Sequence, residues 1–227
     1  MNRFCQISDY SFRLSFWSVA GIVKKMEASY LTRHPRVKDI LNFIGFVLLV
    51  LIGTLLINTY VFRSFSVSGH SMDHTLADGD RLIVDRLPVT AALLKNKPYV
   101  PNRGQIIVFK NPRFLAGMHD EFIVKRVIAF PGERVTVKDG TLTVYNREHP
   151  NGFHPDDEYR RGGVGPQSPS SGDVDTTVPE GVLFVAGDNR IGSSSYDSRT
   201  GLGFVPNHDV VGPVSVRLFP FSKITTF

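Results

Sequence analysis

Ser71 is the clearest candidate nucleophile of this chain, because it lies in the short run SVSGHSMDHTL between two histidines. A serine hydroxyl attacks a carbonyl efficiently when a nearby base accepts its proton. The run begins like the Gly-x-Ser-x-Gly elbow of many hydrolases, but Asp73 occupies the position of the last glycine. The elbow is therefore not predicted, and the question is which side chain acts as the base.

A histidine is one candidate for the base, in an arrangement of serine, histidine and aspartate. His70 adjoins the serine, and in an extended chain its side chain would point to the opposite face. Two more distant histidines are also available, with either of two aspartates to orient the ring: His74 and His208, Asp188 and Asp197. The sequence offers no spacing that tests this arrangement.

Lys125 is the other candidate, because it lies within the apolar stretch EFIVKRVIAF, residues 121–130. In a strand, Ile123 and Val127 would share its face and Arg126 would point to the opposite one. Burial disfavours an ammonium and can lower a lysine pKa from about 10.4 toward about 7 or 8. A neutral amine accepts a proton without a third residue to fix its tautomer. The alternative is a lysine whose stem covers apolar surface while its ammonium reaches water.

The elements that must position these residues are predicted to be mainly strands. Asp139-Gly140 separates two alternating runs and predicts a hairpin turn, which needs positive φ at both positions. After residue 62 no long stretch has helical periodicity. We therefore predict antiparallel sheets packed in two layers. Runs rich in Val, Ile and Phe predict the strands at 81–87, 105–110, 121–130, 134–146, 181–188 and 210–219.

Two stretches interrupt the predicted strands. Residues 146–178 are rich in Gly, Pro, Ser and Asp, which predicts a mobile surface insertion and not a second core. The loop 111–120 carries Phe114, Leu115 and Met118. These side chains either rest on a lipid surface or pack into the core.

An uncharged apolar run precedes the strands. Residues 40–62, at about 1.5 Å per residue, are long enough to cross a hydrocarbon core of roughly 30 Å. A signal peptide cleaved at the small-x-small site 66–68 is the alternative, but its apolar region usually has about 7–15 residues. Residues 1–39 hold seven basic against three acidic residues, and such charge keeps a flanking segment in the cytoplasm. We therefore predict a single-pass anchor in the plasma membrane, with residues 63–227 as an extracytoplasmic catalytic domain.

Composition excludes several other classes. Most of the net charge of +5 lies in residues 1–39, so the rest of the chain lacks the basic surface of a nucleic-acid-binding protein. Cys5 is the only cysteine, so the exported part can form no disulfide. Neither an H-E-x-x-H motif nor a glycine-rich phosphate loop occurs, and we expect no cofactor. Residues 14–23 are too short to span and could lie at the membrane surface, and Met26 is an alternative start.

Four blocks of sequence resemble, in order, the motifs of bacterial type I signal peptidases. These are membrane-anchored serine proteases that remove signal peptides from exported preproteins. The blocks extend from the apolar run almost to the C-terminus: SGHSMDHTLADGDRLIVDRL, RGQIIVFKNP, FIVKRVIAFPGERV and VAGDNRIGSSSYDSRTGLGFVPNHDVVG. The resemblance implies a Ser/Lys dyad, with Ser71 as nucleophile and Lys125 as general base. It implies a monomer whose partners are signal peptides and the lipid bilayer.

The same resemblance implies roles for further residues. The backbone N–H of Ser71 would contribute to an oxyanion hole, and Ser195 would hold the lysine amine. Ion pairs supporting the site would come from Arg126, Asp188, Asp197 and Arg199. Met72 would pack beneath the dyad. A groove that binds the signal peptide as an added strand would be lined by Phe65, Val67, Gly69, Met72, Ile123 and Val124.

The chain departs from the family pattern at several positions. Gly69 stands where some members have a serine that donates to the oxyanion, so the second donor is open. Two extra residues between GDNR and DSR leave Ser193 or Ser194 as alternatives to Ser195. The other departures replace a proline, an aspartate, a glycine and a second aspartate of the family: His74, Gln105, Ala129 and Glu133.

The predicted reaction is acyl transfer after an A-x-A-like site. Ser71 attacks the carbonyl, Lys125 relays the proton to the leaving amine, and water releases the acyl-enzyme. The serine is nine residues beyond Phe62, so even an extended chain keeps it within about 30 Å of the membrane. Alternatives are a Ser/Lys peptidase with a narrower task, such as maturing a pilin-like or conjugation protein, and an inactive homologue that serves as a tethered binding module. The membrane segment disfavours a soluble self-cleaving repressor.

Overall fold

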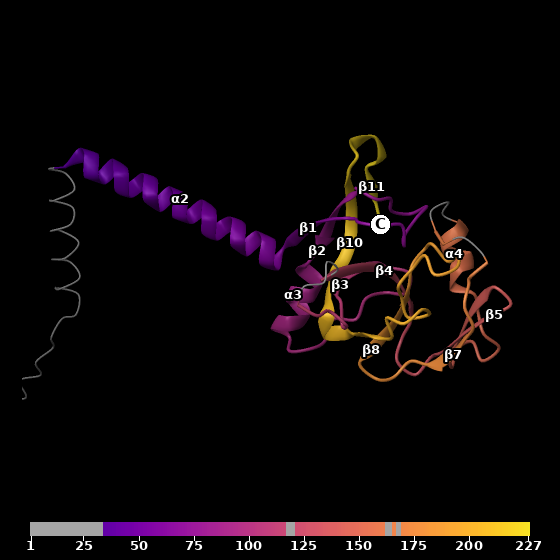
Figure 1. Cartoon of the computed structure of the whole chain (residues 1–227). Coiled ribbons are helices and arrows are strands. Elements are labelled where there is room, and N and C mark those ends of the chain that lie inside the picture. The colour runs from indigo at the N-terminus through magenta and orange to yellow at the C-terminus, as the bar shows by residue number, and fades with distance from the viewer. Residues whose placement is uncertain (1–33, 117–120, 162–164, 167–168) are drawn as a thin grey trace, which may run out of the picture. The chain divides into compact units, whose positions relative to one another are not determined.

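The computed structural model describes residues 34–116, 121–161, 165–166 and 169–227. The chain divides into two units, with the boundary after Thr54. Helix α2 (Pro35–Tyr60) supplies the described part of the first unit and continues into the second (Figure 1). It is long and apolar enough to cross a membrane and buries none of its side chains. It begins five residues before the predicted segment 40–62 and ends two residues before the end of that segment.

The second unit is built on a large antiparallel sheet. Its strand order is β1-β2-β10-β3-β4-β8-β9, with β11 paired to β10. The strands are β1 (Phe62–Ser66), β2 (Arg81–Asp85), β3 (Ile106–Lys110), β4 (Phe122–Ala129), β8 (Val182–Ala186), β9 (Val205–Pro206), β10 (Val210–Phe219) and β11 (Thr225–Thr226). The mainly β, antiparallel fold is confirmed, and each predicted run contains an observed strand.

A smaller sheet has the order β6-β5-β7, from β5 (Arg134–Lys138), β6 (Thr141–Tyr145) and β7 (Val174–Thr177). Asp139 and Gly140 join β5 to β6 with φ of 51° and 76°, as the hairpin prediction requires. Buried side chains of this sheet pack on the large sheet in one cluster, which includes Val135, Leu142, Ile128 and Phe184. The two sheets therefore share a core.

Described parts of residues 146–178, which were predicted as a mobile surface insertion and not a second core, pack against this shared core. Helix α4 (Pro155–Arg161) and β7 lie within the segment. Phe153 bridges to Val144 of β6, and Val178 is buried against the small sheet. Exposed and partly buried residues alternate along β7, but three of its four residues are polar, a composition typical of a loop.

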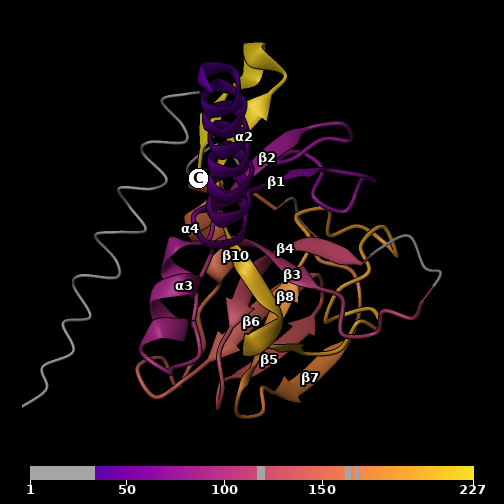
Figure 2. The same cartoon turned by 90° about the vertical axis from the view of Figure 1, so that its left-hand side faces the viewer.

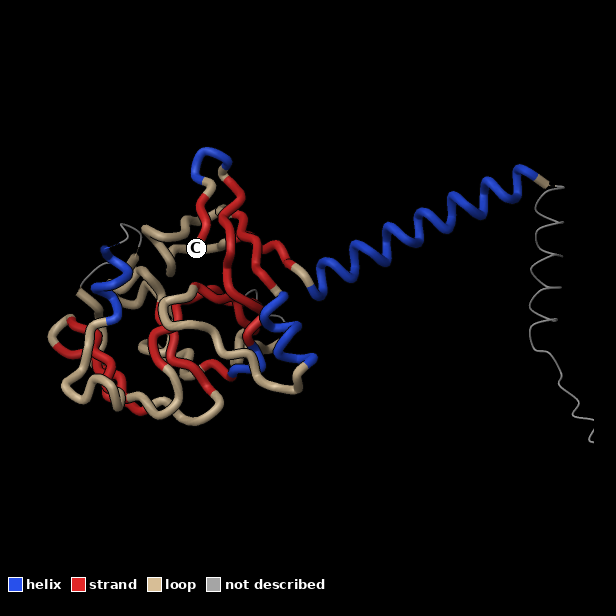
Figure 3. The backbone as a smooth tube through the Cα atoms, turned by 180° about the vertical axis from the view of Figure 1, so that it is seen from behind, coloured by secondary structure: helices blue, strands red, loops and turns tan. Residues whose placement is uncertain are grey.

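Helix α3 (Leu87–Leu94) follows β2 and was not predicted. It lies beside β10 (Figure 2), and α3 and α4 are at opposite ends of the second unit (Figures 1 and 3). In the loop 111–120, Phe114 is half-buried and Leu115 is exposed. Met118, the apolar run 14–23 and Met26 lie outside the described residues.

Candidate active site

Ser71 lies in the turn between β1 and β2, and this turn is anchored in the core on both sides of the serine. Met72 and Leu76 are each 1% exposed, in the cluster beneath the large sheet. Gly69 has a φ of 91°, a conformation that favours glycine, and its N–H donates to Asp78 at 2.8 Å. The anchored turn leaves the half-buried serine facing a groove.

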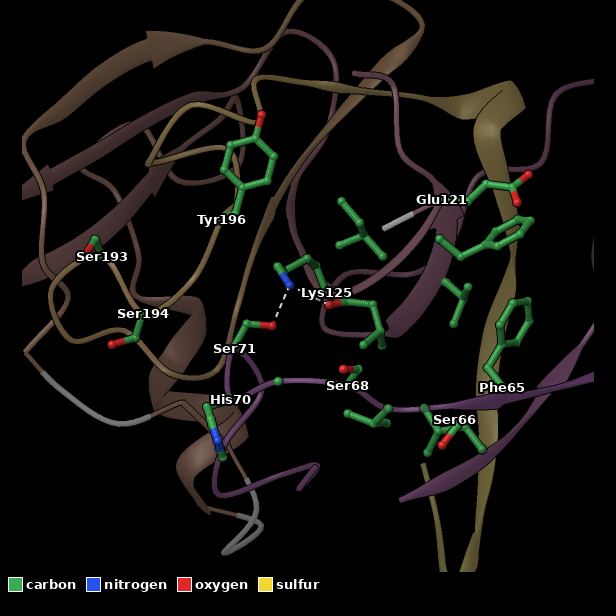
Figure 4. A pocket seen from close by; sticks show the side chains of 17 residues that line it. Phe65, Ser66, Ser68, His70, Ser71, Glu121, Lys125, Ser193, Ser194 and Tyr196 are labelled. Atoms are coloured by element: carbon green, nitrogen blue, oxygen red, sulfur yellow. Dashed lines mark hydrogen bonds between the residues drawn. The ribbon is translucent and has the colours of Figure 1, made fainter. Parts of the chain in front are cut away.

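Lys125 reaches the serine from β4, although the two residues are 54 positions apart in the chain. Its side chain is buried, and its Nζ donates to Ser71 Oγ at 2.7 Å and to the Val124 carbonyl at 2.8 Å (Figure 4). The carbonyl fixes one N–H of the amine. The distance to Oγ is the one that proton transfer between hydroxyl and amine needs.

His70 and His208, two of the three candidate histidines, are directed elsewhere. His70 Nδ1 lies 3.1 Å from Asp73, and the ring points away from the serine hydroxyl (Figure 4). His208 is highly exposed and lies beside Asp209. The aspartates that could have oriented a histidine, Asp188 and Asp197, bind arginines instead. The geometry therefore favours the lysine as the partner of Ser71.

Asp188 joins the two segments that carry the candidate dyad. Its carboxylate is fully buried and accepts Arg126 Nε at 2.8 Å and Nη2 at 2.5 Å. It also accepts the Thr75 hydroxyl at 2.5 Å. Burial alone would lower the pKa of Arg126, but the hydrogen bonds and charge of Asp188 raise it overall. The residue after Lys125 and a residue of the serine turn thus meet on one carboxylate.

Asp197 and Arg199 form a second buried pair behind the site, with Nη2 2.7 Å from the carboxylate. Asp197 also accepts the Gly187 N–H at 2.8 Å. Burial alone would raise the pKa of Asp197, but the Arg199 hydrogen bond and charge and the Gly187 N–H lower it overall. A Cβ on Gly187 would overlap Ser195 Oγ and the Ser71 carbonyl. The pair therefore holds a glycine against which the serine turn packs.

Ser195 does not hold the lysine amine in this structure. Its side chain is buried, and its Oγ has no hydrogen-bond partner within the described part of the chain. The alternatives Ser193 and Ser194 are exposed, and their hydroxyls point away from Lys125 (Figure 4). The Val124 carbonyl orients the amine where Ser195 was expected to do so.

A groove of about 600 Å³ opens at the serine and lysine. Five of the six predicted substrate-binding residues line it: Phe65, Val67, Gly69, Ile123 and Val124. Met72 does not line the groove, because the turn directs its side chain into the core. The other lining residues are Ser66, Ser68, His70, Leu82, Val108, Glu121, Phe122, Ser193, Ser194 and Tyr196.

Sequence reasoning missed two parts of the site. Tyr196 immediately precedes Asp197 and lines the groove, and nothing in its local sequence indicated this position. Arg190 is fully buried, binds Asp156 through both terminal nitrogens, and donates from Nε to the Gly187 carbonyl at 2.6 Å. The only available signal was the run GDNR, which does not indicate that Arg190 binds a residue 34 positions away.

His74, one of the departures from the family pattern, has a backbone conformation that excludes proline. His74 has a φ of 78°, which proline cannot adopt because its ring fixes φ near −65°. The serine turn of this chain is therefore incompatible with the proline that is usual at this position. Among the described residues, no group of three His, Cys, Asp or Glu side chains could hold a metal ion.

Comparison with known proteins shows the family of this chain. Residues 39–219 match the family model described as signal peptidase, peptidase S26. The chain belongs to this family. Signal peptidase I of Bacillus licheniformis is 32% identical over 189 residues, which cover 82% of this chain and 92% of the relative. Signal peptidase I P of Bacillus subtilis subsp. natto is 30% identical over 194 residues, with 82% and 92% covered.

A crystal structure of a signal peptidase I from Enterococcus faecalis V583 is 33% identical and covers 51% of this chain and 97% of that one, with a TM-score of 0.38. As a member of the S26 family, this chain is a serine endopeptidase that acts on exported preproteins and removes their signal peptides. Its apolar helix α2 is consistent with a membrane-bound member.

Proposed function

We propose that this S26 peptidase cleaves after A-x-A-like sites with Ser71 as nucleophile and Lys125 as general base. The observation that carries the proposal is the 2.7 Å contact between the lysine Nζ and the serine Oγ inside a groove. A lysine that is 3% exposed and bonded to a backbone carbonyl has little freedom to serve as a solvent-facing charge. Its position suits proton transfer and not surface solubility.

In the proposed reaction the deprotonated amine of Lys125 takes the hydroxyl proton as Ser71 Oγ attacks the scissile carbonyl. The lysine then gives this proton to the nitrogen of the leaving chain, and the acyl-enzyme forms. Water attacks the ester with the same amine as base and frees the enzyme. The Ser71 N–H would stabilise the oxyanion. The Gly69 N–H is already bonded to Asp78, so it is not the second donor.

The shape of the groove supports an extended substrate. Phe65, Ser66 and Glu121 lie at one end, and Ser194 and Tyr196 lie at the other, with the serine and lysine between them (Figure 4). Segments 65–69 and 122–125 flank the groove and offer strand edges to a peptide. We assign the strand side to the signal peptide and the Tyr196 side to the mature chain.

The proposed topology places residues 1–39 in the cytoplasm, the span at 40–62 across the plasma membrane and residues 63–227 outside, as a single-pass monomer. Strand β1 begins two residues after α2 ends, so the catalytic domain starts where the span stops. Preprotein cleavage sites follow the apolar part of a signal peptide closely. A protease held this near the bilayer would meet them there.

The decisive experiment is cleavage of a preprotein with an A-x-A site by the detergent-purified full chain. Ser71→Ala and Lys125→Ala should each lower kcat at least about 10²–10⁴-fold from mildly acidic to alkaline pH. Lys110→Ala is the matched control, since it removes an exposed lysine from the neighbouring strand. Retained cleavage by Lys125→Ala would refute the dyad.

Two further measurements separate the alternatives. A panel of unrelated preproteins distinguishes a general processing enzyme from a peptidase with one client, since only the former cuts most of them. A serine-reactive acylating probe should label the wild type and not Ser71→Ala. A wild type that neither cleaves nor is labelled would support an inactive binding module.

A further inference from the structure

Helix α3 is apolar except for Thr90. Its sequence, LPVTAALL, contains no charged residue, and none of its residues is buried. Leu87, Leu93 and Leu94 are 53%, 70% and 84% exposed. A helix that is hydrophobic on all sides normally lies in a protein core or in a membrane. The described part of this chain supplies no core around α3.

The position of α3 is fixed relative to the end of the apolar helix. Residues 55–60 of α2 and the whole of α3 belong to the same unit. Thr90 Oγ1 donates to the Tyr60 carbonyl at 2.8 Å, and Arg86 Nε donates to the Thr59 carbonyl at 2.5 Å. These carbonyls close the last turn of α2. The start of α3 is therefore held at the C-terminal end of α2.

Length and charge indicate how α3 meets the lipid. Eight residues span about 12 Å, too short to cross a hydrocarbon core but enough to lie in its interface. Lys95 and Lys97 follow the helix and are exposed. Lysines beside apolar surface extend their ammonium groups toward headgroups, and anionic lipids attract them.

We propose that α3 is an interfacial anchor, with Leu93 and Leu94 in the headgroup–acyl boundary and Lys95 and Lys97 on anionic headgroups. The proposal rests on α2 spanning the membrane, as in the proposed function. A second exposed apolar cluster lies at the C-terminal hairpin, at Phe219 and Phe221. No hydrogen bond is recorded between that hairpin and the last turn of α2 among the described residues, so α3 has the stronger link to the bilayer.

The test uses the full chain in lipid nanodiscs with Cys5 replaced by serine. An environment-sensitive fluorophore is attached to Leu94→Cys, to Phe221→Cys, or to Lys138→Cys as an exposed control on β5. We expect a blue-shifted emission at position 94 that spin-labelled lipid quenches, and neither effect at position 138. In discs containing phosphatidylglycerol, Lys95→Gln with Lys97→Gln should reduce the quenching at position 94, and in discs of phosphatidylcholine alone it should not.

Several results would overturn the proposal. A label at position 94 as water-exposed as that at 138 refutes the lipid contact, and lipid contact only at position 221 moves it to the hairpin. A blue shift without lipid quenching means that protein, such as a second copy, covers α3. Quenching at position 94 that does not change when Lys95 and Lys97 are replaced refutes the headgroup contact. Release of the whole chain by alkaline carbonate refutes the membrane anchor itself, whereas retention with an exposed label at 94 refutes α3 alone.

Discussion

Replacing Asp188 by asparagine should destabilise the catalytic domain strongly. The substitution keeps the size of the side chain but leaves the Arg126 guanidinium, 8% exposed, without its counter-charge. Breaking a buried ion pair from one side costs about 3–5 kcal/mol. For a domain of this size each kcal/mol lowers Tm by about 2–4 °C. We therefore expect Tm to fall by roughly 6–20 °C in Asp188→Asn.

Asp175→Asn is the matched control. Asp175 binds Arg134 through both carboxylate oxygens, at 2.7 and 2.6 Å, but these side chains are 60% and 52% exposed. Water replaces the lost contact there, so Tm should stay close to that of the wild type. Near-UV circular dichroism of the detergent-solubilised chains at neutral pH gives both values. Equal decreases in Tm in the two variants would refute the reasoning, because burial would then not determine how much stability the lost ion pair costs.

Three further predictions follow from the packing and charges. Gly187→Ala should lower kcat about 10²-fold by displacing the Ser71 turn, and unchanged kcat would show that the turn relaxes freely. The pKa of Asp197 is lowered in the folded state, so its ionised carboxylate stabilises the fold above about pH 4. This stabilisation is lost as the pH falls toward the folded pKa. Tm should thus drop more on acidification in the wild type than in Asp197→Asn, and parallel curves would contradict this. Leu142→Ala should cost about 2–5 kcal/mol in chemical denaturation, while the folded fraction keeps its kcat because β6 does not line the groove.

The strands could be predicted where one face is buried and the chain alternates, as in residues 134–146, because that pattern is local. Helix α3 was missed because LPVTAALL has no polar side from which a helical period could be recognised. Strand β7 was missed because its residues VDTT are mostly polar, and only its pairing with β5 explains it. The local sequence of a segment does not predict which distant segment it pairs with.

The candidate site was likewise predicted only in part. The strand pattern around Lys125 allowed its burial on β4 but favoured a lysine whose ammonium reaches water, and only the motif resemblance linked it to Ser71. The expected role of Ser195 came from the motif resemblance alone, and its Oγ has no hydrogen-bond partner within the described residues. The bond between Arg190 and Asp156 had no sequence signal, because each residue alone has the composition of a surface charge.

The short segment 187–190 explains how two distant elements place an amine and a hydroxyl 2.7 Å apart. The Asn189 N–H donates to the Ser71 carbonyl at 3.1 Å, and its side chain donates to the His70 carbonyl at 3.0 Å. Asp188 in the same segment holds Arg126, the neighbour of the lysine. One rigid segment is thus the common reference for both reacting groups, and small displacements cost much in rate. A substitution at Asp188 should therefore lower kcat more than the loss of folded protein accounts for.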